Sequence, residues 1–490
     1  MRERRVLMVA SEAVPFAKTG GLGDVAGALP LALASLGHDV TLVLPRYRGA
    51  TGGTPAGSTQ VSLGGRVFDV AYAEHALADR ARAVLVECPD LFDRAELYGV
   101  GAHDYPDNAA RFAVLARAAL EYGAGQHPAP DIVHAHDWQA GLAPVYLRTL
   151  FAGRAGIAEA AAVFTVHNLA YQGLFPPVWM PALDLGWELF GIEGIEYWGK
   201  LSFLKGGVNF SEMVTTVSPR YAREIQTPEL GFGFDGILRR RGRRVRGILN
   251  GIDDAAWDPA ADPHLPAPYG PDTLDDKRLS KRALLERLGL SAGDEALARP
   301  LVGMVSRLVD QKGFDLLAAL GDSLLSLGAA FVVLGSGEPR YQEMWQALAD
   351  QAPDRVAFRA GFDEPLAHLI EAGADIFLMP SKFEPCGLNQ MYSLRYGTVP
   401  VVHAVGGLDD TIENWNGRTG AGTGFKFRAY TPEALRGALV KALAAFEDRA
   451  AWRAMQRAGM SRDFSWSASA AAYAEVYEAA IRARKRARGK

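Results

Sequence analysis

Polar residues that can bind an anion or a sugar follow directly after several short apolar segments of this sequence. Each apolar segment has the length of a β-strand, and ligands of α/β sheets bind beyond the carboxyl ends of the strands. The pairs are Ile132–Ala135 with His136, Asp137 and Trp138; Ala162–Val166 with His167 and Asn168; Val245–Leu249 with Asn250; Leu301–Val305 with Arg307 and Lys312; and Ile376–Met379 with Glu384. One such pair fits a capped helix start equally well, but five at one edge favour a ligand site.

A glycine-rich segment, residues 18–24, precedes the apolar helical stretch Val25–Leu36. The free amides and the positive end of a helix attract an anion, so a nucleotide diphosphate fits at this helix start. Lys18, Gly21 and Asp24 are the candidate contacts.

Two cations, Arg307 and Lys312, flank the turn after the strand Leu301–Val305, and Gly313 opens the next helix. Both cations can therefore reach the same anion. A leaving nucleoside diphosphate gains negative charge as its bond to the sugar breaks. Fixed cations stabilise that charge more in the transition state than in the ground state. The spacing predicts a diphosphate clamp.

Glu384 lies just before a helix that we expect to begin near Gly387, and a second glycine-rich helix start follows at residues 406–408, with Thr411 in its first turn. Backbone amides at these starts can hold phosphate oxygens. The Glu384 carboxylate can accept hydrogen bonds from sugar hydroxyls or stabilise a cationic sugar ring. Cys386 has no evident base beside it, which favours a structural role or contact with a ligand over nucleophilic catalysis.

A metal site has little support in the sequence. The carboxylate pairs Asp253-Asp254, Asp275-Asp276 and Asp409-Asp410 resemble turn and helix-start residues more than a ligand set. His134 and His136 have no partner pair to complete a zinc site. We therefore expect neither a metal nor another cofactor.

Short β-branched segments alternate along the chain with longer segments of helical period, which is typical of parallel strands joined by crossover helices. A Pro- and Asp-rich stretch, residues 253–275, separates two such series. The expected strands are Val6–Ala10, Val40–Leu44, Ala83–Glu87, Ile132–Ala135, Ala162–Val166, Met213–Val217 and Val245–Leu249, then Leu301–Val305, Ala330–Leu334, Val356–Arg359, Ile376–Met379 and Val399–Val402, with helices such as Lys312–Ser326 and Pro365–Ala372. The sequence predicts an α/β fold with two Rossmann-like, doubly wound domains facing a central cleft.

Length and composition agree with two globular domains: 490 residues, 49% of them hydrophobic, and a net charge of −4. Cys88 and Cys386 form no disulfide framework, and the apolar stretch Val6–Ala10 is too short to direct export or to span a membrane, so we expect a cytoplasmic protein. The basic clusters Arg239–Arg246 and Arg482–Lys490 lack the motifs of nucleic-acid binding and fit solvated surface. We expect neither nucleic acid nor membrane as a partner.

At these residues the chain resembles the bacterial glycogen synthases and plant starch synthases, over nearly its whole length. The carriers of the resemblance are residues 18–24, residues 134–138, residues 165–168, residues 250–253, Ser306-Arg307 with Lys312-Gly313, and residues 384–388. The resemblance implies the GT-B fold, with an N-terminal domain in residues 1–252 on the acceptor side, a nucleotide-sugar-binding domain in residues 253–464, and a C-terminal helix in residues 465–490 that packs back on the first domain.

It also implies a retaining hexosyltransferase that transfers glucose from ADP-glucose to the non-reducing end of glycogen or another α-1,4-glucan. In that comparison Glu384 holds the sugar or stabilises its cation, His167 lines the anomeric carbon, and Asp137 lies near the acceptor. The implied substrate-binding residues are Lys18, Gly21, Asp24, Asn168, Asn250, Arg307, Lys312, Cys386, Gly387, Leu388, Gly406, Gly407 and Thr411.

Other functions stay open at this point. A synthase that uses UDP-glucose shares the architecture. Gly21, Gly23 and Ala26 match the G-x-G-x-x-A fingerprint of nicotinamide-dependent oxidoreductases, although residues 11–19 separate them from the strand, where the fingerprint requires a tight turn. A glucan-binding protein without activity is a third possibility, against which the cations and carboxylate in both halves argue.

Overall fold

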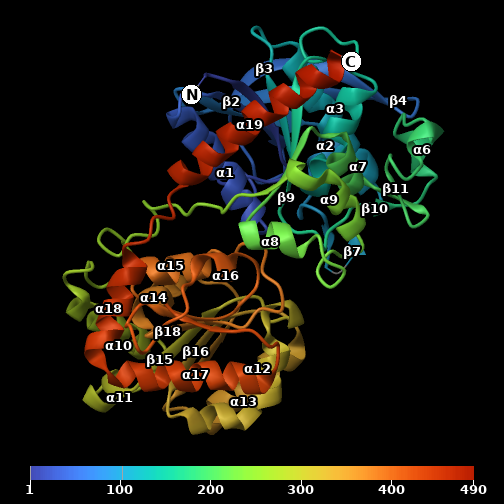
Figure 1. Cartoon of the computed structure of the whole chain (residues 1–490). Helices are drawn as coiled ribbons and strands as arrows, with labels where there is room; N and C mark the ends of the chain where they lie inside the picture. The colour runs from blue at the N-terminus through green and yellow to red at the C-terminus, as the bar shows by residue number, and fades with distance from the viewer. Residues whose placement is uncertain (1, 102, 490) are drawn as a thin grey trace. The chain divides into compact units, whose positions relative to one another are not determined.

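The computed structural model describes residues 2–101 and 103–489, which fold as two compact units (Figure 1). Unit 1 comprises residues 1–217, 222–251 and 466–490, and unit 2 comprises residues 218–221 and 252–465. The sequence analysis placed the two main boundaries at 252/253 and 464/465. In the structure they lie at 251/252 and 465/466, one residue away in each case.

Unit 1 is built on a nine-stranded sheet in the order β14-β13-β9-β8-β1-β2-β5-β4-β3. Its parallel strands are β1 (Arg5–Val9), β2 (Asp39–Pro45), β5 (Ala81–Glu87), β8 (Ile132–His136), β9 (Ala161–Val166), β13 (Met213–Thr216) and β14 (Val245–Gly247). The order of these seven strands reverses between β1 and β8, as in a doubly wound sheet.

Two antiparallel strands at one edge of this sheet were not expected from the sequence. They are β3 (Thr54–Leu63) and β4 (Arg66–Ala78), joined in register from Leu63 with Arg66. Most side chains of β3 are exposed. It therefore lacks the continuous apolar pattern by which buried parallel strands are recognised.

Helices and small sheets surround the main sheet of unit 1. They are α1 (Gly21–Ser35), α2 (Pro89–Phe92), α3 (Asn108–Ala124), α4 (Asp137–Ala140), α5 (Leu142–Arg148), α6 (Trp179–Ala182), α7 (Phe203–Phe210), α9 (Asp235–Arg241) and α19 (Trp466–Arg488), with the short strands β6 (Gly99–Val100), β7 (His103–Asp104), β10 (Leu174–Phe175), β11 (Glu196–Tyr197) and β12 (Lys200–Ser202). Helix α8 (Pro219–Glu224) spans the boundary with unit 2.

Helix α19 belongs to unit 1 although it follows all of unit 2 in sequence. Its buried side chains Tyr473, Val476 and Tyr477 join one hydrophobic cluster with Leu29 and Leu33 of α1. Arg4, just before β1, forms an ion pair with Glu478 at 2.6 Å. Helix α19 is therefore part of the core of unit 1 (Figure 1).

Unit 2 contains a six-stranded parallel sheet in the order β17-β16-β15-β18-β19-β20, the strand order of a Rossmann fold. The strands are β15 (Leu301–Val305), β16 (Ala330–Gly335), β17 (Val356–Ala360), β18 (Ile376–Met379), β19 (Val399–His403) and β20 (Phe425–Phe427). Of these, β20 was not expected from the sequence. Its three residues are too few to stand out as an apolar run.

The helices of unit 2 are α10 (Lys277–Arg287), α11 (Asp294–Ala298), α12 (Phe314–Leu320), α13 (Pro339–Gln351), α14 (Glu364–Gly373), α15 (Asn389–Arg395), α16 (Gly406–Thr411), α17 (Pro432–Glu447) and α18 (Arg449–Met460). The expected helix Lys312–Ser326 is wrong as a single element. It begins at Phe314 and ends at Leu320, because Gly313 and Gly321 both have positive φ, and a 3₁₀ segment follows.

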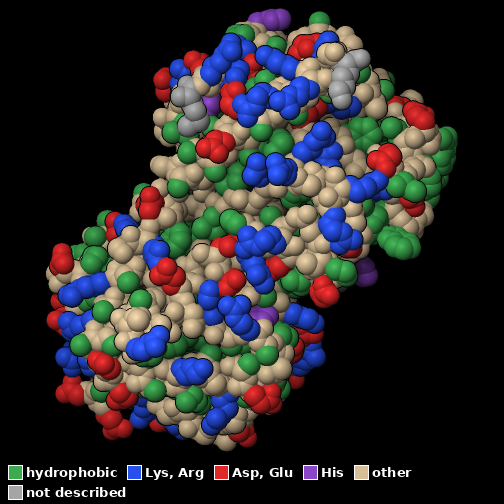
Figure 2. Space-filling model, viewed as in Figure 1, with side chains coloured by type: hydrophobic (Ala, Val, Ile, Leu, Met, Phe, Trp, Pro, Cys, Tyr) green, Lys and Arg blue, Asp and Glu red, His purple; other side chains and the backbone are tan. Residues whose placement is uncertain are grey.

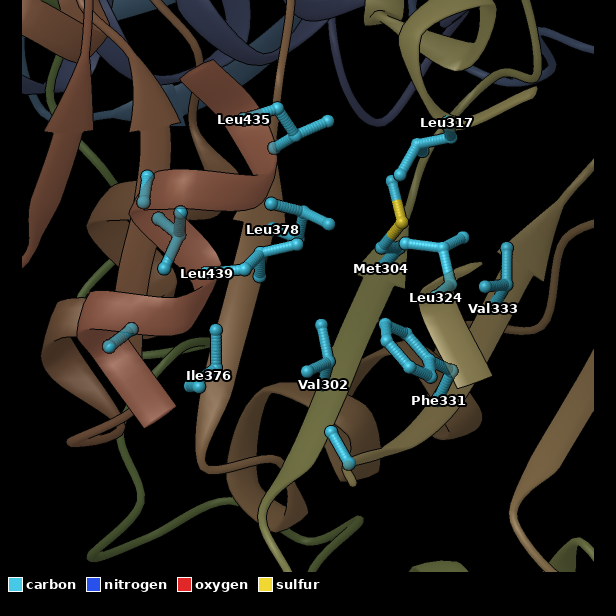
Figure 3. Packing of buried hydrophobic residues seen from close by; sticks show 14 of the residues in the cluster. Val302, Met304, Leu317, Leu324, Phe331, Val333, Ile376, Leu378, Leu435 and Leu439 are labelled. Carbon is cyan, nitrogen blue, oxygen red and sulfur yellow. The ribbon is translucent and has the colours of Figure 1, made fainter. Parts of the chain in front are cut away.

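The core of unit 2 explains why its strands are apolar on both faces. Val302, Met304, Phe331 and Leu439 of α17 belong to one cluster of buried side chains (Figure 3). Leu301, which points to the opposite face, joins a second cluster. Helices on both sides of a parallel sheet produce this double burial.

Charged side chains of both signs are spread over the face of the molecule in Figure 2. In the basic cluster Arg239–Arg246, Arg239 pairs with Asp235 at 2.7 Å and Arg240 pairs with Glu193. These local ion pairs fit the solvated surface expected for the cluster. Within the described part of the chain, no helix has the length and apolar character needed to cross a bilayer.

Candidate functional site

The two sheets carry polar residues at the point where their strand order reverses. In unit 1 this point lies between β1 and β8, which lead into the loop of Lys18 and into Asp137. In unit 2 it lies between β15 and β18, which lead into Arg307 and Glu384. Ligands of doubly wound sheets bind at such points. Each unit therefore has a candidate half-site.

The glycine-rich loop of unit 1 is held in place by Glu12, a residue that the sequence did not single out. Its carboxylate accepts hydrogen bonds from the backbone N–H of Thr19 at 2.5 Å and of Gly20 at 3.3 Å. Tyr98 also donates to it from its hydroxyl at 2.7 Å. No motif surrounds Glu12, so only its place just after β1 could have drawn attention to it.

Helix α1 begins at Gly21, four residues earlier than expected, so Asp24 lies in its first turn. The ammonium group of Lys18 forms an ion pair with Asp24 at 2.7 Å, and half of the Lys18 side chain is exposed. Gly21 has open space where a side chain would lie. The loop thus presents a solvent-accessible cation beside a helix start.

Asp137, the first residue of α4, has a φ of 55°. This left-handed conformation costs a non-glycine residue about 1 kcal/mol or more. Its carboxylate accepts hydrogen bonds from the backbone N–H groups of His167, at 2.7 Å, and of Asn168. Burial raises the pKa of Asp137 to about 7, against the lowering effect of these two N–H groups. Asp137 thereby connects the ends of β8 and β9.

Three histidines behind Asp137 form a continuous chain. The Nδ1 atom of His136 lies 2.9 Å from Nε2 of His167, and the rings of His134 and His136 lie 4.1 Å apart. His134 is also hydrogen-bonded to Thr165 at 2.6 Å and to the hydroxyl of Tyr477 at 3.0 Å. Helix α19 therefore contacts the back of this half-site.

Burial lowers the pKa of these histidines, to about 3 for His134 and His167 and well below 6.5 for His136. They are neutral in the folded chain at pH 7, whereas unfolded histidine has a pKa of about 6.5. Because the folded pKa is the lower one, their contribution to stability is complete above about pH 6.5 and is lost as the pH falls toward 3.

We expect the free energy of unfolding, measured by urea denaturation between pH 7 and pH 4.5, to fall with pH less steeply in His134→Gln than in the parent chain. Each histidine that stays neutral on folding contributes up to about 1.4 kcal/mol per pH unit in this range. The exposed His103→Gln is the control and should keep the parent slope. Equal slopes in all three proteins contradict a neutral buried His134.

The two asparagines of the candidate site differ in their surroundings. Asn168 accepts a hydrogen bond from the N–H of Ala170 at 3.1 Å, so it shapes the turn after β9. Asn250 is buried, and within the described residues its Oδ1 atom has no hydrogen-bond partner. A buried acceptor without a partner is uncommon.

In unit 2 the two predicted cations have different environments. Arg307 is exposed, and its guanidinium group approaches the side-chain oxygen of Gln311 at 3.5 Å. Lys312 lies in a 3₁₀ turn that ends at Gly313, which has a φ of 81°. A Cβ atom at Gly313 would lie 2.2 Å from the carbonyl oxygen of Pro380. Glycine at this position therefore brings Lys312 close to the end of β18.

Lys312 contacts Glu384 directly. Its Nζ atom donates to Oε2 of Glu384 at 2.5 Å, and Ser381 donates to the same oxygen at 3.0 Å. Glu384 is 6% exposed. The other oxygen, Oε1, receives no hydrogen bond from the residues that the structure describes. A fixed carboxylate with one oxygen available can accept a hydrogen bond from a sugar hydroxyl.

The glycines of the second predicted phosphate site have a different use in this structure. The N–H of Gly407 donates to the carbonyl oxygens of Glu384 and Pro385, at 3.1 and 3.2 Å. Cβ atoms at Gly406 and Gly407 would lie 1.8 Å from the carbonyl oxygen of Glu384 and 2.0 Å from that of Cys386. In this structure the Gly407 amide therefore supports the turn that carries Glu384.

The residues around this turn are also held from within unit 2. Helix α15 begins at Asn389, with Leu388 as its N-cap, and Gly387 has a φ of 71°. Thr411 is the last residue of the six-residue helix α16, not part of its first turn as expected. The side-chain amide of Gln390 reaches Thr411 and the carbonyl oxygen of the buried Cys386. Together they pack the glycine turn against the Glu384 segment.

Gly407→Ala is expected to move the Glu384 turn, since the added methyl group meets backbone atoms that cannot rotate away. We expect a loss of stability of about 2 kcal/mol, in the range for overpacking, and a turnover reduced by at least tenfold. Thermal unfolding and steady-state assays measure the two effects. The control is Gly437→Ala on α17, where no atom lies within 4 Å of the added group. Parent-like behaviour of Gly407→Ala contradicts the close packing.

Within the described residues, no group of three or more His, Cys, Asp or Glu side chains is arranged to hold a metal ion. The chemistry that the two half-sites themselves offer is anion binding by cations and amides, together with a fixed carboxylate.

Comparison with known proteins connects these half-sites to one family. A family model described as the starch synthase catalytic domain matches residues 5–240, and one described as glycosyl transferases group 1 matches residues 293–458. A glycogen synthase of Anaeromyxobacter dehalogenans strain 2CP-C is 53% identical over 474 residues, which cover 96% of this chain and 99% of that protein. A glycogen synthase of Koribacter versatilis strain Ellin345 is 49% identical, with 98% and 99% covered.

Solved structures show the same likeness. The catalytic domain of starch synthase IV from Arabidopsis thaliana, bound to ADP and acarbose, is 34% identical with a TM-score of 0.88, and the match covers 98% of this chain and 100% of that one. Sucrose-phosphate synthase from Thermosynechococcus elongatus, 17% identical with a TM-score of 0.61 and with 97% and 98% of the two chains covered, shares the fold.

Proposed function

The chain belongs to the glycogen synthase and starch synthase family of glycosyltransferases, and we propose that it lengthens α-1,4-glucan chains with glucose taken from ADP-glucose. It is a hexosyltransferase of the GT-B fold, with a nucleotide sugar as donor and a glucan as acceptor. The nicotinamide-dependent alternative is wrong, because the whole chain matches glycosyltransferases. The loop between Val9 and Gly21 is also too long for the tight turn of the dinucleotide fingerprint.

One observation carries the proposed chemistry: the buried carboxylate of Glu384 held by Lys312, with Arg307 exposed at the end of the neighbouring strand. In our proposal Arg307 and Lys312 bind the diphosphate of the donor. They stabilise the negative charge that it gains as the glycosidic bond breaks. Glu384 faces the sugar through Oε1 and stabilises the positive charge that develops on the ring.

Unit 1 contributes the second set of residues in this proposal. Lys18 exchanges its ion pair with Asp24 for the donor phosphate. The backbone of His167, fixed by Asp137, lines the anomeric carbon. The acceptor hydroxyl attacks from the face that the diphosphate leaves, which retains the anomeric configuration. The fixed loop around Glu12 and the chain of histidines support this arrangement, because preorganised groups need no reorganisation during the reaction.

ADP-glucose is proposed as the donor because the starch synthase IV structure is bound to ADP. Glycogen is proposed as the acceptor because the most similar relatives named above are glycogen synthases. We also propose a cytoplasmic location. Cys88 and Cys386 are buried and form no disulfide, which supports this location because disulfides are rare in reducing compartments.

The purified chain, incubated with glycogen and either ADP-glucose or UDP-glucose without added metal, tests the proposal. We expect release of nucleoside diphosphate together with growth of the glucan, and faster release from ADP-glucose. Preference for UDP-glucose corrects the donor. Diphosphate release without glucan growth, or no release from either donor, contradicts the proposed transfer.

A further inference from the structure

Unit 1 displays a tryptophan in a conformation that tryptophan rarely adopts. Trp198 lies at the tip of the β11–β12 hairpin and is 83% exposed. Its φ is 51°, and Gly199 follows with a φ of 76°, in the two-residue turn between the paired residues Tyr197 and Lys200. Asn-Gly is the favoured pair for a turn with two positive φ angles, because a bulky first residue is strained there. The sequence thus places a large apolar ring in water at a strained position.

Trp198 lies beside Tyr197 and Phe232. The ring centroids of Trp198 and Tyr197 are 6.4 Å apart, and the hydroxyl of Tyr197 donates to the backbone carbonyl of Phe232 at 3.0 Å. Phe232 also has a positive φ, of 47°, and is 39% exposed. A Cβ atom at Gly233 would lie 3.9 Å from the indole nitrogen of Trp198. Two strained, exposed aromatic residues from distant segments are therefore neighbours.

Both residues are connected to the loop that carries the candidate site residues of β9. Gln172 donates from its side chain to the Phe232 carbonyl at 3.0 Å, and the carbonyl of Gln172 accepts from Ser202 of β12 at 3.0 Å. The neighbouring Tyr171 is 53% exposed and lies three residues after Asn168. We call Tyr171, Trp198 and Phe232 the aromatic surface. In Figure 2 hydrophobic side chains gather along the edge of unit 1 where Figure 1 labels β10, β11 and α6.

We propose that the aromatic surface binds glucose units of the acceptor chain that lie away from its reacting end. This inference rests on the proposed function. Glucose rings in an α-glucan carry no charge and have an apolar face of C–H groups, which packs on aromatic rings, while the ring edges carry hydroxyls. All three side chains of the surface are uncharged and have a large flat face. Rigid, preformed aromatic contacts bind at a low cost in conformational entropy.

The location favours a glucan over other occupants. The aromatic surface is connected through Gln172 to the loop of His167 and Asn168, so a chain whose end reaches that loop continues past it. The backbone strain also has a physical reason in this case, since strained conformations persist at sites where a side chain must be presented to a ligand. A second copy of this protein is the competing occupant, because exposed apolar patches also mediate association.

Trp198→Asn is the sharpest test. It creates the favoured Asn-Gly turn, so folding is retained or improved while the ring is lost. We expect an unchanged or higher melting temperature, about tenfold weaker retention in native gels that contain glycogen and no donor, and a similarly raised KM for glycogen. The kcat and the KM for ADP-glucose should stay the same. The KM for maltotriose should also stay the same, because maltotriose is too short to reach from the reacting end to the aromatic surface.

Two further variants define the effect. Trp198→Phe keeps an aromatic face and should recover most of the retention. Trp187→Ala, which removes an exposed ring that packs against Phe190, should behave like the parent chain. Light scattering gives the molar mass of each protein. A parent mass of two or more copies that falls to one copy in Trp198→Asn overturns the proposal in favour of a second copy.

The outcomes separate this inference from the proposed function. Normal transfer with unchanged glycogen retention in Trp198→Asn overturns the aromatic surface and leaves the function standing. A parent chain that transfers no glucose, yet is retained by glycogen only when Trp198 is present, supports the surface and contradicts the proposed function.

Discussion

Glu384→Gln is expected to lower kcat by about 10³-fold, the upper end of what removing one electrostatic stabiliser costs. The variant has nearly the same shape and keeps an oxygen for Ser381, but it lacks the negative charge that faces the sugar. That charge matters most when the ring becomes cationic, so the KM for ADP-glucose should change by less than about threefold. Steady-state kinetics with saturating glycogen measure both constants.

The control for this prediction is Glu413→Gln, which removes a carboxylate from an exposed ion pair with Arg462 in the same unit. It should retain parent kinetics, since exposed ion pairs contribute about 1 kcal/mol or less. Thermal unfolding of Glu384→Gln should show a folded protein. A folded Glu384→Gln with parent kcat removes Glu384 from the catalytic residues.

Arg307→Ala is expected to reduce kcat/KM for ADP-glucose by about 10²-fold with no loss of stability. Arg307 is exposed, and its contact with Gln311 is long, so the folded chain gains little from this side chain. The loss should therefore be functional only. Arg307→Lys keeps the charge but not the planar pair of donors, and should recover part of the activity.

Arg436→Ala, which removes an exposed arginine from α17, is the matched control and should leave kcat/KM and stability unchanged. The decisive measurement is the affinity of the Arg307→Ala variant for ADP. If the arginine binds the diphosphate, affinity for ADP falls in parallel with kcat/KM, as isothermal titration can show. Unchanged affinity for ADP together with unchanged kcat/KM rejects the diphosphate clamp at this residue.

Except for the three-residue β20, the parallel strands of both units were predictable from sequence, because their burial on two faces leaves continuous apolar segments such as Leu301–Val305 and Ile376–Met379. The placement of Asp137, Arg307 and Glu384 at strand ends followed from the same pattern. The strand order of the structure then showed that these strand ends lie at the switch point of each sheet. These features depend on local sequence and on one general rule of topology.

Features that depend on tertiary approach could not be predicted. Nothing near Glu12 in sequence indicates that it accepts hydrogen bonds from Thr19 and Tyr98. The sequence around Gly407 is that of a glycine-rich helix start that can bind phosphate. Only the folded structure shows that the Gly407 N–H donates to the carbonyl oxygen of Glu384. The β3–β4 hairpin was missed because exposed strands lose the apolar signal.

Helix α19 has a consequence for how the chain is made. Tyr473 and Tyr477 are buried in the core of unit 1, and most of the other core residues of this unit precede position 252. During translation unit 2 emerges complete before those two side chains leave the ribosome. The core of unit 1 therefore stays incomplete during the synthesis of some 200 residues, which at about 5–20 residues per second lasts ten seconds or more.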